Sequence, residues 1–148
     1  MIELSEQGKA NVRRWVDWLR GPYADKATRN RTVSDDGKCY CAVGVLLDAT
    51  CQETGITRLN YGFSIAKVDT KGREYNEFSG VGWTMFDLPS KLGIPDDLLS
   101  KAAKLNDQMK TATFEPVAKF LEEACDTPPS QWDALMLKHA LTNGVSPV

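Results

Sequence analysis

Four cysteines and a single histidine are the strongest candidates in this chain for metal binding or nucleophilic chemistry. Zinc needs three or four ligands in a tetrahedral arrangement, usually supplied as close pairs such as C-x2-C. The only close pair here is Cys39 and Cys41, whereas Cys51, Cys125 and His139 stand alone. On one helix, residues two apart face different sides. This spacing favours buried thiols over a metal site, and it predicts neither a metal nor another cofactor.

His139 is the only histidine that could act as a general base. Nucleophilic catalysis needs such a base beside a serine, cysteine or threonine. His139 shares the apolar stripe of a predicted helix with Trp132, Leu135 and Met136, which favours a packed or capping role. Residues 62–66 lack the last glycine of a nucleophile elbow. These patterns predict a protein that is not an enzyme.

Gly37 and Lys38 come directly before the most apolar stretch of the chain. They do not form a G-x-x-x-x-G-K-[ST] phosphate loop, because Thr32 replaces its first glycine and Cys39 follows the lysine. A helix that starts here would still offer unpaired backbone N–H groups to an anion. A simple turn before a buried helix is the alternative.

Cationic and aromatic side chains surround this predicted helix start. The cations would contact phosphate, and the aromatic rings would contact a base. We therefore predict ligand contacts from Tyr23, Lys26, Arg31, Lys38 and Tyr40.

Three further residues extend the predicted site, and each has a structural alternative. Trp83 lies in a glycine-flanked stretch and could stack on a base, although a place in the core is the first interpretation of a tryptophan. Asn106 and Asp107 stand between two apolar helical patterns. They could hydrogen-bond a ribose or base, with a helix C-cap and turn as the alternative.

The elements that would position these residues are mainly helical. Ser5 can cap a first helix with an apolar stripe, and Gly21 ends it. The run from Cys39 to Cys51 predicts a buried central helix that stops before Gly55. Within it, Gly44 costs roughly 1 kcal/mol relative to alanine, which predicts close packing against another element.

The remaining pattern completes an α+β fold, a mainly helical single domain over residues 1–148 with the buried central helix and a small β-hairpin. Residues 63–68 and 74–78 suit the two hairpin strands. Further helices are predicted from Leu88, Asp96, Thr113 and Ser130.

Composition narrows the classes of function. The 148 residues are 42% hydrophobic and 26% charged, as in an ordinary folded domain. A net charge of -2 argues against duplex nucleic acid as a partner, although residues 1–38 carry eight basic against six acidic side chains. No run reaches the ~20 apolar residues of a membrane span, and no signal peptide pattern is present. We expect a cytoplasmic protein without a membrane partner, with reduced cysteines.

Three stretches resemble a family of small bacteriophage and prophage proteins. Trp15 to Tyr23 is similar to the family pattern W-V-x-A-L-R-S-G-x-Y, and Cys41 to Asp48 resembles C-C-L-G-V-L-C-D. Leu105 to Asp107 matches a downstream L-N-D. The chain departs from the pattern at Ala42 and Leu47, where the family commonly has cysteines. The resemblance implies a phage-encoded accessory protein, a class that includes inhibitors of bacterial defence.

Some small phage proteins of that class act as sponges that hold nucleotide-derived immune signals without cleaving them. Together with the candidate residues, the resemblance favours a non-enzymatic binding protein that sequesters a small anionic, nucleotide-like ligand in the host cytoplasm. The alternative is an inhibitor that binds a host protein through an exposed helix, such as the C-terminal one. A homo-oligomer remains open.

Overall fold

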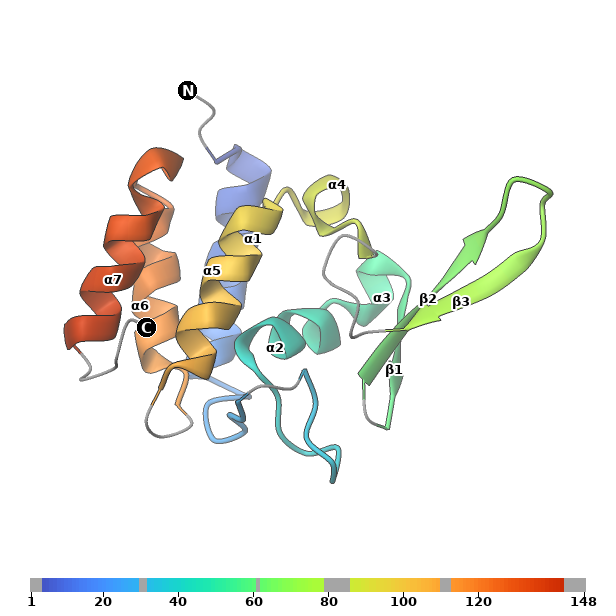
Figure 1. The fold of residues 1–148 in the computed structure, drawn as a ribbon, viewed down its shortest axis with the longest axis horizontal. Helices are drawn as coiled ribbons and strands as arrows, with labels where there is room; N and C mark the ends of the chain where they lie inside the picture. Colours follow the sequence, from blue (N-terminus) through green and yellow to red (C-terminus); the bar gives the residue numbers. More distant parts are fainter. Residues whose placement is uncertain (1–3, 30–31, 61, 79–85, 110–112, 143–148) are drawn as a thin grey trace.

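The computed structural model describes residues 4–29, 32–60, 62–78, 86–109 and 113–142. These residues form seven α-helices and a three-stranded antiparallel sheet, which confirms the mainly helical α+β domain. Helices α1, α5, α6 and α7 lie side by side, α2 crosses one end of this group, and the sheet lies beyond α3 (Figure 1). None of the described helices is both long enough and apolar enough to cross a membrane.

Helix α1 (Glu6–Arg20) follows its sequence pattern. The hydroxyl of Ser5 accepts a hydrogen bond from the Gly8 amide at 3.0 Å, as an N-cap does, and the helix ends at Gly21. The predicted apolar stripe is buried, and the indole N–H of Trp15 donates to the Ala42 carbonyl at 2.8 Å. This hydrogen bond ties α1 to the start of α2.

The predicted central helix is shorter than expected. Helix α2 (Ala42–Ala49) begins three residues later than predicted because Cys41 is its N-cap, with the sulfur accepting from the Gly44 amide at 3.4 Å. It ends at Thr50, and α3 (Cys51–Thr54) follows. The expected burial is confirmed over residues 42–47.

Close packing at Gly44 is confirmed. A Cβ atom built there would overlap the Thr32 carbonyl oxygen, so the backbone of an extended segment lies directly against α2. The neighbour is therefore a loop and not another helix.

The remaining helices are α4 (Leu88–Leu92), α5 (Asp96–Asp107), α6 (Glu115–Ala124) and α7 (Trp132–Thr142). The cap predicted at Thr113 is wrong, since α6 starts after Phe114 and has no side-chain cap. The helix predicted from Ser130 begins as a 3-10 turn, Pro129–Gln131, which leads into α7. Buried contacts join α6 to α1, α5 and α7, so α6 lies within the helical group.

The sheet contains the predicted hairpin and one strand that was not predicted. Strands β2 (Gly62–Val68) and β3 (Glu74–Phe78) pair antiparallel, and β1 (Ile56–Leu59) pairs with β2 on the other side. Ile56 lies opposite Ile65, and both are buried. The tip of the β2–β3 hairpin extends away from the helices (Figure 1). Strand β1 instead follows α3 closely and brings its side chains to the end of α2.

Candidate functional site

The start of α2, where an anion site was predicted, is occupied by protein groups. The Ala42 amide donates to the side-chain oxygen of Asn106 at 3.1 Å, and the Gly44 amide donates to Cys41. Burial raises the pKa of the Cys41 thiol to about 11, so this cap is neutral at physiological pH. The prediction of a free anion site is wrong here, because these two N–H groups already have acceptors within the fold.

Asn106 is a structural residue and not an exposed ligand contact. It is 2% exposed, and its side-chain nitrogen donates to the Thr28 carbonyl at 3.0 Å and to Asp107 at 3.3 Å. Both ends of its amide are therefore used to hold together α5, α2 and the segment between α1 and α2. Asp107 is exposed at the end of α5.

The other predicted site residues separate into three groups. Lys26 pairs with the adjacent Asp25 at 3.7 Å, and Lys38 is exposed with its backbone amide donating to Asp36. Arg31 and Trp83 lie outside the described residues. The rings of Tyr23 and Tyr40 are in contact, with centroids 5.5 Å apart in an edge-to-face arrangement, and the Tyr40 amide donates to the Lys26 carbonyl at 2.7 Å.

The two tyrosines meet a charged pair at the opposite end of α2. Asp48, in the last turn of α2, accepts a hydrogen bond from the Tyr23 hydroxyl at 2.6 Å. Its other oxygen lies 3.3 Å from Nε of Arg58, which comes from β1. We call Tyr23, Tyr40, Asp48 and Arg58 the Arg58 cluster.

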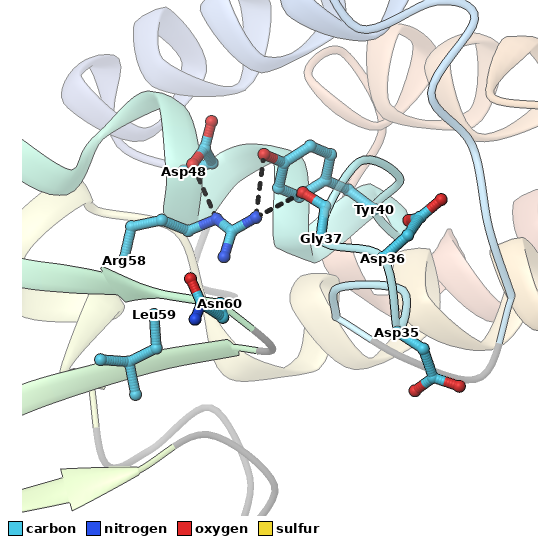
Figure 2. Close-up of a pocket in the computed structure, with 8 residues that line it drawn as sticks. All are labelled: Asp35, Asp36, Gly37, Tyr40, Asp48, Arg58, Leu59 and Asn60. Atoms are coloured by element: carbon cyan, nitrogen blue, oxygen red, sulfur yellow. Dashed lines mark hydrogen bonds and ion pairs between the residues drawn. The ribbon is translucent and has the colours of Figure 1, made fainter.

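The guanidinium of Arg58 is held from several sides (Figure 2). Besides the contact with Asp48, Nη2 donates to the Gly37 carbonyl at 2.7 Å and to the Tyr40 hydroxyl at 3.4 Å. Its carbon atom lies 5.3 Å from the centre of the Tyr40 ring, a cation–π distance. Among the described residues, none accepts a hydrogen bond from Nη1. Within that part of the chain, one nitrogen of a fixed cation therefore has no hydrogen-bond acceptor.

Local sequence explains how the loop reaches Arg58. Gly37 adopts a φ of +73°, which completes the turn after Asp35 and Asp36, and Asp36 accepts from the Lys38 amide at 3.0 Å. Tyr40 then bridges two extended segments, pairing with Ala27 and Val33. This places the Gly37 carbonyl against the guanidinium of Arg58.

Two open depressions meet at the Asp48–Arg58 pair. The first has a volume of about 470 Å³ and the second about 540 Å³. Besides this shared pair, the first is lined by Asp35, Asp36, Gly37, Tyr40, Leu59 and Asn60, and the second by Tyr23, Ala49, Cys51, Gln52 and Glu53. Arg58 is the only cationic side chain among these lining residues.

The charges around Arg58 limit how much anionic charge a ligand can carry. Asp48 is its carboxylate partner, whereas the side chains of Asp35 and Asp36 point away from it (Figure 2). The side chains of Arg58 and Asp48 are 25% and 21% exposed, so the pair is only partly screened by solvent. Several phosphates would meet repulsion from these carboxylates.

The hydroxyl and thiol groups of the second depression are held in their protonated forms. Burial, reinforced by the bond to Asp48, raises the pKa of Tyr23 well above its usual value. Burial likewise raises the pKa of Cys51, and its thiol donates to the Leu47 carbonyl at 3.1 Å. A protonated thiol is a poor nucleophile. No group of three metal-ligating side chains occurs within the described part of the chain.

Comparison with known proteins adds no relative. No family model, curated protein or solved structure matches this chain. The geometry of the Arg58 cluster is therefore the main clue to function, and the phage-protein resemblance stays a hypothesis.

Sequence reasoning missed Arg58 and did not nominate Asp48. Arg58 is one isolated arginine in a four-residue strand, which no periodic pattern distinguishes. Asp48 carried one available signal, since it ends the stretch that resembles the phage-family motif. An acidic residue in the last turn of an apolar helix is also unfavourable beside the helix dipole unless a cation is near.

Proposed function

We propose that this protein is a non-enzymatic binding protein that captures a small nucleotide-derived ligand at the Arg58 cluster. The observation that carries the proposal is a guanidinium held by Asp48, Gly37 and Tyr40 at the edge of two depressions. Its Nη1 has no hydrogen-bond acceptor within the described part of the chain. Such a preorganised cation loses little freedom when it binds a phosphate oxygen. Charge-assisted hydrogen bonds to phosphate are among the stronger ones in proteins.

The polar lining suits the other parts of a nucleotide. Asn60 and Gln52 each bring an amide to one depression, and an amide can accept hydrogen bonds from hydroxyl or amino groups. A ribose and a base offer such donors. Base stacking on Tyr40 has no support, because its ring is 8% exposed and contacts both Tyr23 and Arg58.

Retention without turnover is favoured by the protonation states at the site. Catalysis by attack on the ligand would need an activated nucleophile, whereas Tyr23 and Cys51 have raised pKa values. Contacts made to the bound ground state increase affinity without accelerating a reaction. We therefore extend the proposal to the sponge activity that the phage-protein resemblance implies, namely sequestration of a host immune signal.

Capture from a mixture tests this proposal. The protein is incubated with a nucleotide extract, washed and heated, and the released material is identified by mass spectrometry. We expect wild-type protein to release a nucleotide of unchanged mass and Arg58→Gln to release at least about tenfold less, since a charged hydrogen bond is worth about 1.5–3 kcal/mol.

Arg73→Gln is the matched control, because Arg73 is 71% exposed and pairs with Asp69 in the hairpin. It should release as much nucleotide as wild type. Arg58→Gln alone leaves the Asp48 carboxylate without its cation, which destabilises the fold. The double variant Asp48→Asn/Arg58→Gln removes both charges, so a loss of capture in this variant reports a lost ligand contact and not misfolding. Equal capture by wild type and a folded double variant, or release of a chemically altered nucleotide, would contradict the proposal.

A second candidate function, binding to a protein partner, is favoured by one observation on α7. Leu137 and Leu141 lie one turn apart and are 42% and 58% exposed, whereas Trp132 and Ala140 are buried. Exposed apolar pairs on one helix face are common at protein interfaces. Leu137→Glu/Leu141→Glu should abolish such an interaction and leave nucleotide capture unchanged.

A further inference from the structure

The Asp48–Arg58 pair is the only part of the described structure that lines both depressions. Asp48 stands in the last turn of α2 and Arg58 stands on β1, so their contact forms a partition between the two. The depressions have similar volumes, about 470 and 540 Å³, each within the ~300–1,000 Å³ typical of small-molecule sites. One cationic side chain, Arg58, therefore lies between two depressions of similar volume.

We infer that the Arg58 cluster binds a two-headed ligand of the dinucleotide type, with one nucleoside in each depression and the linking phosphodiester on Arg58. The inference rests on the proposed function and narrows its ligand class. It follows from the number of cations: Arg58 is the one cationic lining residue and its Nη1 has no acceptor among the described residues, so the site suits the single charge of one phosphodiester better than several charges. A nucleoside triphosphate would bring several charges toward Asp48 and the acidic rim.

The two depressions differ in the head group that they suit. The first has the carboxylates of Asp35 and Asp36 at its rim, and Asp36 already accepts hydrogen bonds from the Ser34 hydroxyl at 2.5 Å and the Lys38 amide at 3.0 Å, so this negatively charged rim favours an uncharged head. The second contains the amide of Gln52, while its carboxylate Glu53 is already engaged with Arg14 at 2.5 Å. The Arg14 guanidinium lowers the pKa of Glu53, which keeps that pair charged.

The test compares adenosine monophosphate with adenylyl-(3′→5′)-adenosine, which has one phosphodiester and two nucleosides, by isothermal titration calorimetry. If both depressions are used, the dinucleotide should bind on the order of a hundredfold more tightly, because its second head binds intramolecularly. Gln52→Trp, which fills the second depression, should reduce dinucleotide affinity to the level that wild-type protein shows for the mononucleotide.

Gln131→Trp is the matched control, since Gln131 is exposed in the 3-10 turn and lines neither depression. It should keep the full preference for the dinucleotide. Mononucleotide binding without any gain for the dinucleotide would overturn the two-headed ligand and leave the proposed function standing. Failure of both molecules to bind wild-type protein would overturn both.

Discussion

The two ends of helix α2 differ in how their polar groups are satisfied. At the first end, Asn106 and Cys41 accept from backbone amides and the backbone of Thr32 packs against Gly44. At the last end, Asp48 meets Arg58 beside two depressions, and one nitrogen of Arg58 has no acceptor among the residues that the structure describes. A closed helix start stabilises the fold, whereas an incompletely satisfied charged group at an open surface is available for binding.

Gly44→Leu should have the largest effect on stability. Even a methyl group would overlap the Thr32 carbonyl oxygen, so we expect a loss of about 3 kcal/mol or more in the free energy of unfolding. Urea denaturation followed by circular dichroism measures it. Ala134→Leu, at an exposed position of α7, is the control and should change stability by less than about 0.5 kcal/mol. An unchanged denaturation midpoint in Gly44→Leu would show that the first end of α2 is open.

Asn106→Ala should have the next largest effect. It leaves the Ala42 amide and the Thr28 carbonyl without their partner, and an unsatisfied buried group costs about 1–3 kcal/mol. The variant should unfold at lower urea concentration while its remaining folded fraction binds nucleotide with wild-type affinity. Lys104→Ala, an exposed change on the same helix, serves as the control. A specific loss of affinity at unchanged stability would instead place Asn106 in the ligand site.

Tyr23→Phe should have a smaller effect that depends on pH. The pKa of Tyr23 is raised in the folded protein by burial and by Asp48, so folded Tyr23 keeps its proton above pH ~10, where tyrosine in the unfolded chain loses it. Its contribution to stability is therefore complete below that pH and is lost as pH rises toward the folded-state pKa.

Urea denaturation of wild type and Tyr23→Phe at pH 7 and pH 10.5 measures this contribution. We expect the variant to lose about 1–2 kcal/mol at pH 7, with a smaller difference between the two proteins at pH 10.5. Tyr75→Phe is the control, because Tyr75 is 44% exposed on the hairpin. If the stability difference between the two proteins grew from pH 7 to pH 10.5, the pH dependence would have the opposite sign to the one expected. That result would contradict the hydrogen bond between Tyr23 and Asp48.

Arg20→Gln should have the smallest effect. Arg20 joins α1 to α6 through Glu115 at 3.0 Å and Glu122 at 2.8 Å, yet all three side chains are at least 34% exposed. Surface ion pairs contribute about 0–1 kcal/mol and weaken with salt. The loss measured by urea denaturation should therefore shrink further at 1 M sodium chloride. A large loss of stability that persists at 1 M sodium chloride would contradict this expectation. It would show that solvent exposure alone does not determine how Arg20 and Arg58 differ.

The elements with strong local signals were predictable, and the site was not. Helix α1 combines an apolar period with a serine cap and a terminal glycine, so local chemistry alone specifies it. The start of α2 was misplaced because cysteine is an uncommon N-cap, and the apolar run continues through it. Strand β1 was missed because its four residues depend on pairing with β2.

The contact between Asp48 and Arg58 depends on the chain reversal between α2 and β1. Gly55, with a φ of +73°, ends α3 and turns the chain so that β1 runs beside the end of α2. That reversal is set by tertiary packing, and neither charged residue alone indicates its partner. Tyr23 and Tyr40 were predicted to lie around the start of α2. In the structure their rings are in contact, and the Tyr23 hydroxyl reaches Asp48 in the last turn of α2.

The central claim, that ligand capture occurs at the Asp48 end of α2, is tested most directly by comparing two cation variants. Isothermal titration calorimetry measures adenosine monophosphate binding to wild type, Arg58→Gln and Lys38→Gln. Lys38 precedes the closed end and lines neither depression. We predict that Arg58→Gln weakens binding by at least about tenfold and that Lys38→Gln leaves it within about twofold. Loss of binding in Lys38→Gln with full affinity in Arg58→Gln would contradict the account.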